Sequence, residues 1–372
     1  MNIKTILVVE DEDRMITLLQ DALDDWNVAN EGSTRHFEAV FVKSPEGAAQ
    51  EVYSKKIDCA LVDLRLPPDE DSNKTDADNG NALAAALLSE NGIPVAIISG
   101  HPGDAEPSLV DGGTVRAFEK ADDGYDQAVG WLASQWELMD ALRAVRQRLE
   151  QSTAEVFARR IWPNWSQMAD AIGHDNDKLA VAIARQYASH TAELLSQDAA
   201  GDWHPFENFI VPSYVDDRAH TGDVFHLDGI NWIVLTPQCD MATAKIPNVL
   251  LAECALGTEH WTEKLREQWD ENLKELRAAT SNNKRKKPAK LLRDFVNQNL
   301  PASVHFLPPI PGTEEPILVQ FGKIRTIPLI ELNEQLAARV ASVSPPFLSN
   351  LVQRFGAFIS RTGQPNIGVE HL

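Results

Sequence analysis

Four short apolar runs in the first third of the chain each lead into polar side chains. The runs cover residues 6–9, 59–62, 94–98 and 115–119, with helix-like stretches between them. Short runs of this kind are typical of buried parallel strands. Because the carboxyl ends of parallel strands meet at one edge of an open α/β sheet, we expect the polar groups to lie together there. These groups are Glu10, Asp11, Asp63, Ser99 and Lys120.

Three carboxylates, a hydroxyl and an ammonium at one sheet edge suit a divalent cation and a phosphoryl group. Mg²⁺ prefers oxygen ligands and keeps several waters, so two or three carboxylates are enough to hold it. A central carboxylate, here Asp63, can attack phosphorus and carry the phosphoryl group as an acyl phosphate. The lysine and the hydroxyl then stabilise charge on the transferring oxygens. Acidic residues at strand ends are common without such a site, so the prediction depends on the full set.

The four runs and their flanking residues resemble the receiver domain of two-component response regulators. The resemblance covers residues 1–125 and implies a doubly wound, flavodoxin-like α/β fold with a parallel sheet. It also implies that a histidine kinase or a phosphotransfer protein donates a phosphoryl group to this chain. A receiver that only docks a partner, without being phosphorylated, is the alternative. The matching pieces are ILVVEDED (6–13), DCALVDLRLP (58–67), PVAIISG (94–100) and RAFEKAD (116–122).

The resemblance gives each strand-end residue a role. It implies that Asp63 is the phospho-acceptor and that Glu10 and Asp11 are the carboxylates that bind Mg²⁺ together with it. The backbone carbonyl of Arg65 would be a further ligand of the metal. The residues that would contact the phosphoryl group itself are Ser99 and Lys120.

Three features depart from the usual receiver pattern. Ala117 stands three residues before the lysine, where receivers often carry an aromatic switch residue, and Phe118 follows it. Ala121 replaces the proline that usually follows the lysine, which puts the usual cis bond there in doubt. Segment 67–80 is longer and more acidic than the usual loop, and it could screen the site or dock a partner. None of these departures removes a residue needed for phosphorylation.

Composition limits the kinds of protein that this chain can be. Its 372 residues are enough for two or three domains, and 43% of them are hydrophobic, which is ample for their cores. No run approaches the ~18 apolar residues of a membrane span, and the N-terminus leads into a strand without a signal-like segment. Three widely spaced cysteines, Cys59, Cys239 and Cys254, favour reduced thiols over a disulfide framework. We therefore expect a cytoplasmic protein that does not contact a membrane.

Negative charge is concentrated in the predicted receiver. The chain has a formal net charge of −21, of which residues 1–125 contribute −15. Phosphate binding needs Lys and Arg, so this balance argues against general affinity for nucleic acid, but it does not exclude a local basic surface. One basic run, 284–290, stands out. We expect a solvated loop there, and a contact for RNA, DNA or an acidic partner, such as the acidic residues 69–78 of the same chain, is the alternative.

Residues 126–200 are predicted to form a helical connector. Apolar residues recur there at spacings of three and four, as in an amphipathic helix, and the sequence 162–165 interrupts the pattern. The connector could be a spacer packed on its neighbours, or it could form a homodimer whose helices relay the state of the receiver. Its second stretch places these residues on one face: Leu179, Ile183, Tyr187, Thr191, Leu194 and Leu195.

Residues 201–372 are predicted to form an α+β output domain around a small SH3-like β-barrel. Strand-like runs on both sides of Asp228 and Gly229 favour a hairpin at that pair. The other expected elements are strands at 249–252, 317–321 and 326–330, a charged helical insertion at about 259–300, and a helix over 345–360 with Phe347, Leu351, Phe355 and Ile359 on one face.

The predicted output domain shows no helix-turn-helix pattern of a DNA-binding domain and no motif of a common signalling enzyme. The leading prediction is therefore a non-enzymatic response regulator that binds a protein under phosphorylation control, or that drains phosphoryl groups from a shared kinase. The alternative is a receiver-gated effector enzyme or toxin, directed at nucleic acid, in a bacterial defence-type signalling system. Its candidate site is Cys239 as nucleophile, His226 or His260 as base, and Asp240 as the orienting group. A buried thiol beside a helix-capping Asp240 is the plainer interpretation.

Overall fold

The computed structural model describes residues 2–67, 76–111, 113–121, 123–197, 203–213, 217–258 and 261–362, with the side chains of 194–197 left out. The chain divides into two compact units, Met1–Asp198 and Ala199–Leu372. Within the described parts, no helix is long and apolar enough to cross a membrane.

The first unit is built on five parallel strands in the order β2-β1-β3-β4-β5. This strand order is that of flavodoxin-like doubly wound sheets, so the predicted fold of this part is confirmed. The three central strands read as apolar runs because the sheet is covered on both faces. The strands are β1 (Asn2–Val9), β2 (Arg35–Val42), β3 (Cys59–Asp63), β4 (Val95–Ser99) and β5 (Val115–Glu119).

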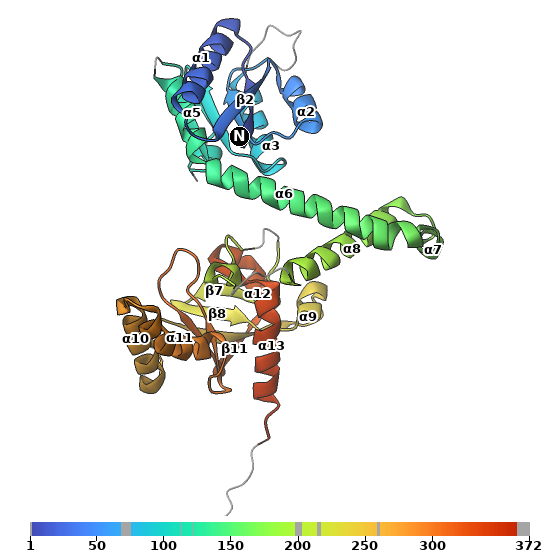
Figure 1. The fold of residues 1–372 in the computed structure, drawn as a ribbon. Coiled ribbons are helices and arrows are strands. Elements are labelled where there is room, and N and C mark those ends of the chain that lie inside the picture. Colours follow the sequence, from blue (N-terminus) through green and yellow to red (C-terminus); the bar gives the residue numbers. More distant parts are fainter. Residues whose placement is uncertain are drawn as a thin grey trace, which may run out of the picture. The chain divides into compact units, whose positions relative to one another are not determined.

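Helices cover both faces of this sheet (Figure 1). Successive residues of a strand point to opposite faces. Ile6 and Val8 accordingly pack with α1 and α5, whereas Leu7 and Val9 pack with α2, α3 and α4. The bounds are α1 (Asp13–Ala29), α2 (Pro45–Ser54), α3 (Ala77–Ser89), a 3-10 turn η1 (Pro102–Asp104), α4 (Pro107–Val110) and α5 (Gly124–Ser134).

The layered core extends into the next helix, α6 (Trp136–Val156). Trp136 and Met139 are fully buried in the cluster that α1 and α5 form on the sheet. The Trp136 ring stacks on Trp26 of α1 with centroids 5.7 Å apart. The α/β core thus reaches beyond residue 125, and the first turns of α6 belong to it.

The remaining helices of this unit run on from α6. A π-helical turn, η2 (Phe157–Ile161), leads into α7 (Trp162–Ile172), and α8 (Asn176–Gln197) follows after Gly173. The expected interruption at 162–165 is therefore only a change of helix type, because Pro163 lies in the first turn of α7, where a missing N–H is tolerated. A 2.9 Å hydrogen bond between the Ser152 and Thr191 hydroxyls ties α6 to α8. Of the predicted apolar face of α8, Leu194 and Leu195 lie outside the described side chains.

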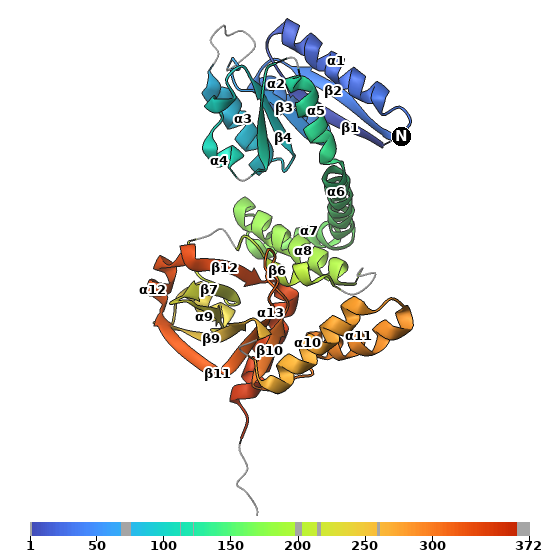
Figure 2. The ribbon, with the colours of Figure 1, turned by 90° about the vertical axis from the view of Figure 1, so that its left-hand side faces the viewer.

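The second unit contains an antiparallel sheet of seven strands in the order β10-β11-β9-β8-β7-β12-β6. The sheet curls into a half-barrel (Figure 2), which confirms the predicted α+β fold with a small, curled β-sheet. The strands are β6 (Phe209–Ile210), β7 (Asp223–Leu227), β8 (Ile230–Val234), β9 (Asn248–Leu256), β10 (Val304–Leu307), β11 (Ile317–Pro328) and β12 (Arg339–Val343).

Two strand predictions for this sheet have different outcomes. The hairpin at Asp228 and Gly229 is confirmed, and both residues have the positive φ angles, 53° and 77°, that a two-residue turn of type I′ requires. The strand expected at 317–321 is present, but the separate strand expected at 326–330 is wrong, because β11 continues to Pro328, and Leu329 and Ile330 begin α12 (Leu329–Glu334). A bulge between Gln320 and Ile324 interrupts the pairing of β11 with β9 and hides its continuity in the sequence.

The charged insertion forms two helices, α10 (Glu263–Ala278) and α11 (Asn282–Val296). The basic run 284–290 lies within α11, so the expected loop is wrong. Its local sequence is highly charged and contains a proline, but Pro288, Leu292 and Phe295 are buried and hold the segment as a helix. Packing of one face thus outweighs weak local propensity.

The predicted C-terminal helix is present as α13 (Pro345–Ile359). Leu351 and Phe355 are buried on the curled sheet as expected, whereas Ile359 is 61% exposed, which corrects its assignment to the buried face. The short elements of this unit are η3 (Pro205–Asn208), α9 (Gln238–Thr243), α12 (Leu329–Glu334) and η5 (Leu336–Ala338).

Candidate functional site

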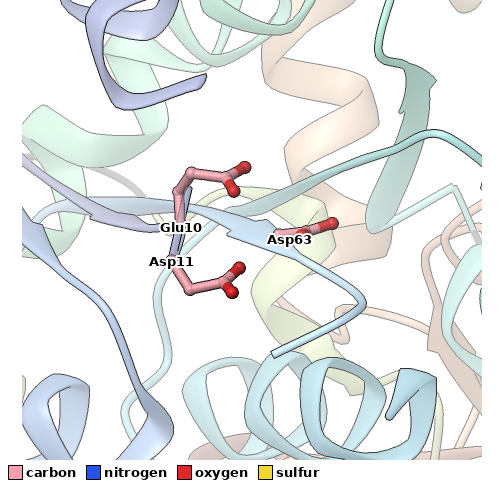
Figure 3. Close-up of side chains that lie close together, drawn as sticks. All are labelled: Glu10, Asp11 and Asp63. Atoms are coloured by element: carbon pink, nitrogen blue, oxygen red, sulfur yellow. The ribbon is translucent and has the colours of Figure 1, made fainter. Parts of the chain in front are cut away.

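Three carboxylates meet at the carboxyl edge of the parallel sheet (Figure 3). Glu10 and Asp11 directly follow β1, and Asp63 is the last residue of the neighbouring strand β3. Each side chain offers one oxygen, and these oxygens all lie within 4.8 Å of one another. Glu10 and Asp63 are buried, and Asp11 is half-buried. The topology therefore brings together the three residues that the sequence placed at strand ends.

Lys120 supplies the positive charge at this edge. Its Nζ lies 2.7 Å from Oε2 of Glu10 and 3.0 Å from Oδ2 of Asp63. Burial lowers the pKa of Lys120, but the charges and hydrogen bonds of Glu10 and Asp63 outweigh this effect, so the pKa is raised. The lysine therefore stays protonated and bridges the carboxylates of β1 and β3.

One ammonium does not balance three carboxylates. Burial, and then the charge of Asp63, raise the pKa of Glu10 from 4.5 to about 7, against the opposing effect of Lys120. The pKa of Asp11 is also raised, mainly by burial. Crowded carboxylates of this kind are relieved by a hard divalent cation with oxygen ligands. The donor set therefore fits Mg²⁺, which Glu10, Asp11 and Asp63 would hold.

Close packing of α3 against the β3 end fixes the turn that follows Asp63. The Gly80 N–H donates a 3.1 Å hydrogen bond to the Leu64 carbonyl. A Cβ atom at Gly80 would overlap backbone atoms of Asp63 and Leu64. Only glycine thus allows α3 to approach Asp63 and Leu64 so closely. Within the same turn, the exposed Arg65 side chain forms an ion pair with Asp104 at 3.0 Å. The role of the Arg65 backbone carbonyl as a metal ligand stays a prediction.

Ser99 lies at the end of β4, between the strands that carry Asp63 and Lys120. Its carbonyl accepts a 2.9 Å hydrogen bond from the Lys120 N–H, and its buried hydroxyl accepts one of 3.2 Å from the His101 N–H. The hydroxyl is thus held near the edge of the sheet where the resemblance places it, and it keeps a proton to donate.

The departures near Lys120 have structural consequences. Ala117 lines a hollow of about 460 Å³ together with Val110 and Trp131, with an alanine methyl group where receivers often place an aromatic side chain. Phe118 is buried in the core on the α5 side, so it does not take the place of a surface switch residue. The peptide bond before Ala121 is trans. Of the acidic segment 67–80, residues 68–75 lie outside the described part, and Asp76 caps α3.

The alternative site near Cys239 is not assembled among the described residues. Cys239 lies at the start of α9, exposed, with a long 3.7 Å contact from Sγ to Oδ1 of its neighbour Asp240. His226, the first candidate base, pairs instead with Asn231 across the hairpin at 2.8 Å. His260, the second candidate, lies outside the described residues. The exposed thiol also corrects the plainer interpretation of Cys239 as a buried one.

Sequence reasoning missed how α6 is bound to the amino edge of the parallel sheet. Arg143 donates to both carboxylate oxygens of the buried Asp58 and, at 2.8 Å, to the carbonyl of Ile3. Lys4, fully buried in β1, contacts Asp140 of α6 at 2.6 Å. A lysine within an apolar strand was the one available signal that a partner must cover this edge.

A buried polar network in the second unit was also missed. Asp223 at the start of β7 is fully buried and accepts hydrogen bonds from the Ser342 hydroxyl at 2.5 Å, the Arg339 guanidinium at 3.0 Å and the His220 N–H at 2.8 Å. Three donors satisfy the carboxylate and tie β7 to β12. Arg339 and Ser342 lie more than a hundred residues from Asp223 in the sequence, so no local pattern indicates these two contacts.

Comparisons with known proteins find likeness only at the level of fold. No protein-family model matches the chain, and no curated protein is found as a relative. Among solved structures, the signal receiver domain of an HD domain-containing protein from Pseudomonas fluorescens Pf-5 is 17% identical, with a TM-score of 0.29, over 38% of this chain and 99% of its own. The response regulator TrrA from Thermotoga maritima, solved with Mg²⁺ and BeF, is 18% identical, with a TM-score of 0.27, over 35% of this chain and 98% of its own.

NtrX from Brucella abortus is 21% identical, with a TM-score of 0.30, over 39% of this chain and 29% of its own. This chain thus matches less than a third of that NtrX chain. The assignment of a receiver fold depends on the strand order and helix layers of this structure itself. Residues 2–134 therefore contain a doubly wound α/β fold of the receiver type, with an acidic cluster at the carboxyl edge of its sheet.

Proposed function

We propose that the chain is a response regulator that accepts a phosphoryl group on Asp63 from a histidine kinase or a phosphotransfer protein. The observation that carries the proposal is the meeting of Glu10, Asp11 and Asp63 within 4.8 Å, with Lys120 bridging two of them. A structural ion pair would not need three carboxylates against one ammonium.

The reaction divides among the residues at the sheet edge. An Asp63 oxygen forms the new bond to phosphorus as the bond from phosphorus to the donor's histidine nitrogen breaks, which gives an aspartyl phosphate. Mg²⁺, held by Glu10, Asp11 and Asp63, would neutralise charge on the carboxylates and on the transferring oxygens. The Lys120 ammonium is within reach of an oxygen on Asp63, and the Ser99 hydroxyl can donate from the next strand end.

We further propose that phosphorylation acts through protein binding, or that the chain serves as a phosphate sink, rather than through catalysis by the second unit. The contacts of Arg143 and Asp140 fix α6 to the amino edge of the sheet, so a change in the sheet is passed to this helix. The connector would then present a surface, or a homodimer contact, that depends on the state of Asp63.

Intact mass measured after incubation with Mg²⁺ and acetyl phosphate tests the acceptor site. We expect the wild type to gain one phosphoryl group and Asp63→Asn to gain none, while the exposed control Asp25→Asn behaves as wild type. Omission of Mg²⁺ should abolish the gain. Light scattering on the same samples reports a change of oligomeric state. An equal gain in Asp63→Asn would contradict the assignment.

A further inference from the structure

We propose that the exposed basic side of α11 binds the phosphate backbone of a nucleic acid. The inference is independent of the proposed phosphorylation of Asp63. We call this surface the α11 basic face. It consists of Lys284, Arg285, Lys286, Lys287 and Lys290, all of them exposed.

The cations of the α11 basic face have no counter-charge of their own. Within the described part of the chain, none of the five side chains makes an ion pair or a hydrogen bond. The preceding helix α10 is different, because its four cations alternate with five carboxylates along the helix. Free positive charge is therefore concentrated on one short surface of a chain whose net charge is −21.

The arrangement is unfavourable for the helix itself. Four consecutive cations, 284–287, lie in the first two turns, where the helix dipole is positive, and the first turn has no acidic residue. Lys286 and Lys290 are like charges at a spacing of four, which adds repulsion. The helix persists because its other side is buried, where the Phe295 ring stacks on Trp261 with centroids 5.9 Å apart and meets Trp269 edge to face at 5.2 Å. A bound polyanion would relieve this repulsion.

The composition of the surface favours phosphate over an acidic protein. The cores of protein–protein interfaces are rich in aromatic and apolar side chains and poor in Lys. Residues 282–287 include neither an aromatic nor an aliphatic side chain. Contacts from Lys and Arg to the phosphate backbone need no such core and carry no sequence information. We therefore infer binding without sequence preference.

Fluorescence anisotropy of the full-length protein with short labelled single-stranded RNA, single-stranded DNA and duplex DNA tests the inference. The test variant combines Lys286→Gln, Lys287→Gln and Lys290→Gln. The control combines Lys264→Gln, Lys274→Gln and Arg277→Gln on α10, which removes the same charge. A second test variant combines Lys286→Arg, Lys287→Arg and Lys290→Arg, so that it keeps the charge. Circular dichroism verifies that each variant folds.

We expect the wild type to bind at least one of the three nucleic acids, with log K falling linearly as log salt rises. The Gln variant should bind at least tenfold more weakly and lose about one unit of the salt slope per phosphate contact removed. The α10 control and the Arg variant should bind as the wild type does. Binding to none of the three probes, or equal binding by the Gln variant, would overturn the inference. Equal competition by polyglutamate would also overturn it, because the surface would then select charge and not phosphate.

Discussion

Replacement of Glu10 by Gln should stabilise the first unit and at the same time prevent phosphoryl transfer. Burial and the charge of Asp63 raise the pKa of Glu10 from 4.5 to about 7 in the folded chain. The unfolded chain keeps the ordinary pKa, so the folded state binds this proton more tightly. The stability linked to Glu10 is therefore present below pH 4.5 and is lost as the pH rises from 4.5 to about 7.

The size of the effect follows from the two pKa values. A shift from 4.5 to about 7 corresponds to about 3 kcal/mol of lost stability at pH 8 and about 1 kcal/mol at pH 5. Gln keeps the shape of Glu without its charge. We therefore expect Glu10→Gln to raise the free energy of unfolding by about 3 kcal/mol at pH 8 and by about 1 kcal/mol at pH 5.

Urea unfolding of the full-length protein at both pH values, in EDTA, measures this gain. Hydrogen exchange in peptides that span β1 and β3 assigns the transition to the first unit. Glu12→Gln, an exposed neighbour, is the control and should change stability little. A Glu10→Gln protein no more stable than wild type at pH 8, or equally stabilised at both pH values, would refute the argument.

Three further changes probe other parts of the structure. Gly80→Ala should cost about 1–3 kcal/mol of stability in the urea assay, because the new methyl group overlaps Asp63 and Leu64, and it should slow phosphorylation. The control Gly130→Ala, on the open side of α5, should stabilise the protein by about 0.5–1 kcal/mol in the same assay. Burial, and then Arg354, lower the pKa of His305 from 6.5 to about 3, so the stability linked to it is present above pH 6.5 and falls as the pH drops towards 3. The free energy of unfolding of the second unit should fall by about 2 kcal/mol between pH 7.5 and pH 5. His305→Leu should remove this fall, and an unchanged pH dependence in that variant would count against the role of His305. Arg143→Met leaves the buried Asp58 without its cation, but Arg143 is 43% exposed, so we expect a loss of about 1–2 kcal/mol rather than the larger cost of a fully buried pair. The loss should shrink in the Asp58→Asn background, and an undiminished loss would show that packing, not charge, explains it.

The acidic site could be predicted because its position follows from topology. Glu10, Asp63 and Lys120 each directly follow or end a strand, and parallel strands bring those ends to one edge whatever the loops do. The sequence could not show that Lys120 bridges Glu10 and Asp63, because this depends on side-chain geometry. It also gave no account of Gly80, whose importance lies in the close approach of α3.

The second unit was less predictable because long-range packing decides its structure. The basic run 284–290 reads as a loop, yet the burial of Pro288, Leu292 and Phe295 makes it helical. One bulge joins two expected strands into β11. The contact of Asp223 with Arg339 joins residues more than a hundred positions apart. Patterns of period 2 or 3.6 carry no information about such contacts.

Identification of the phosphorylated residue tests the central claim most directly. After incubation with Mg²⁺ and acetyl phosphate, borohydride reduction converts an aspartyl phosphate into homoserine, and tandem mass spectrometry locates the change. We predict homoserine at position 63 in the wild type and no homoserine in Asp63→Asn. Modification at another residue, or an unmodified Asp63 in a folded protein, would contradict the account.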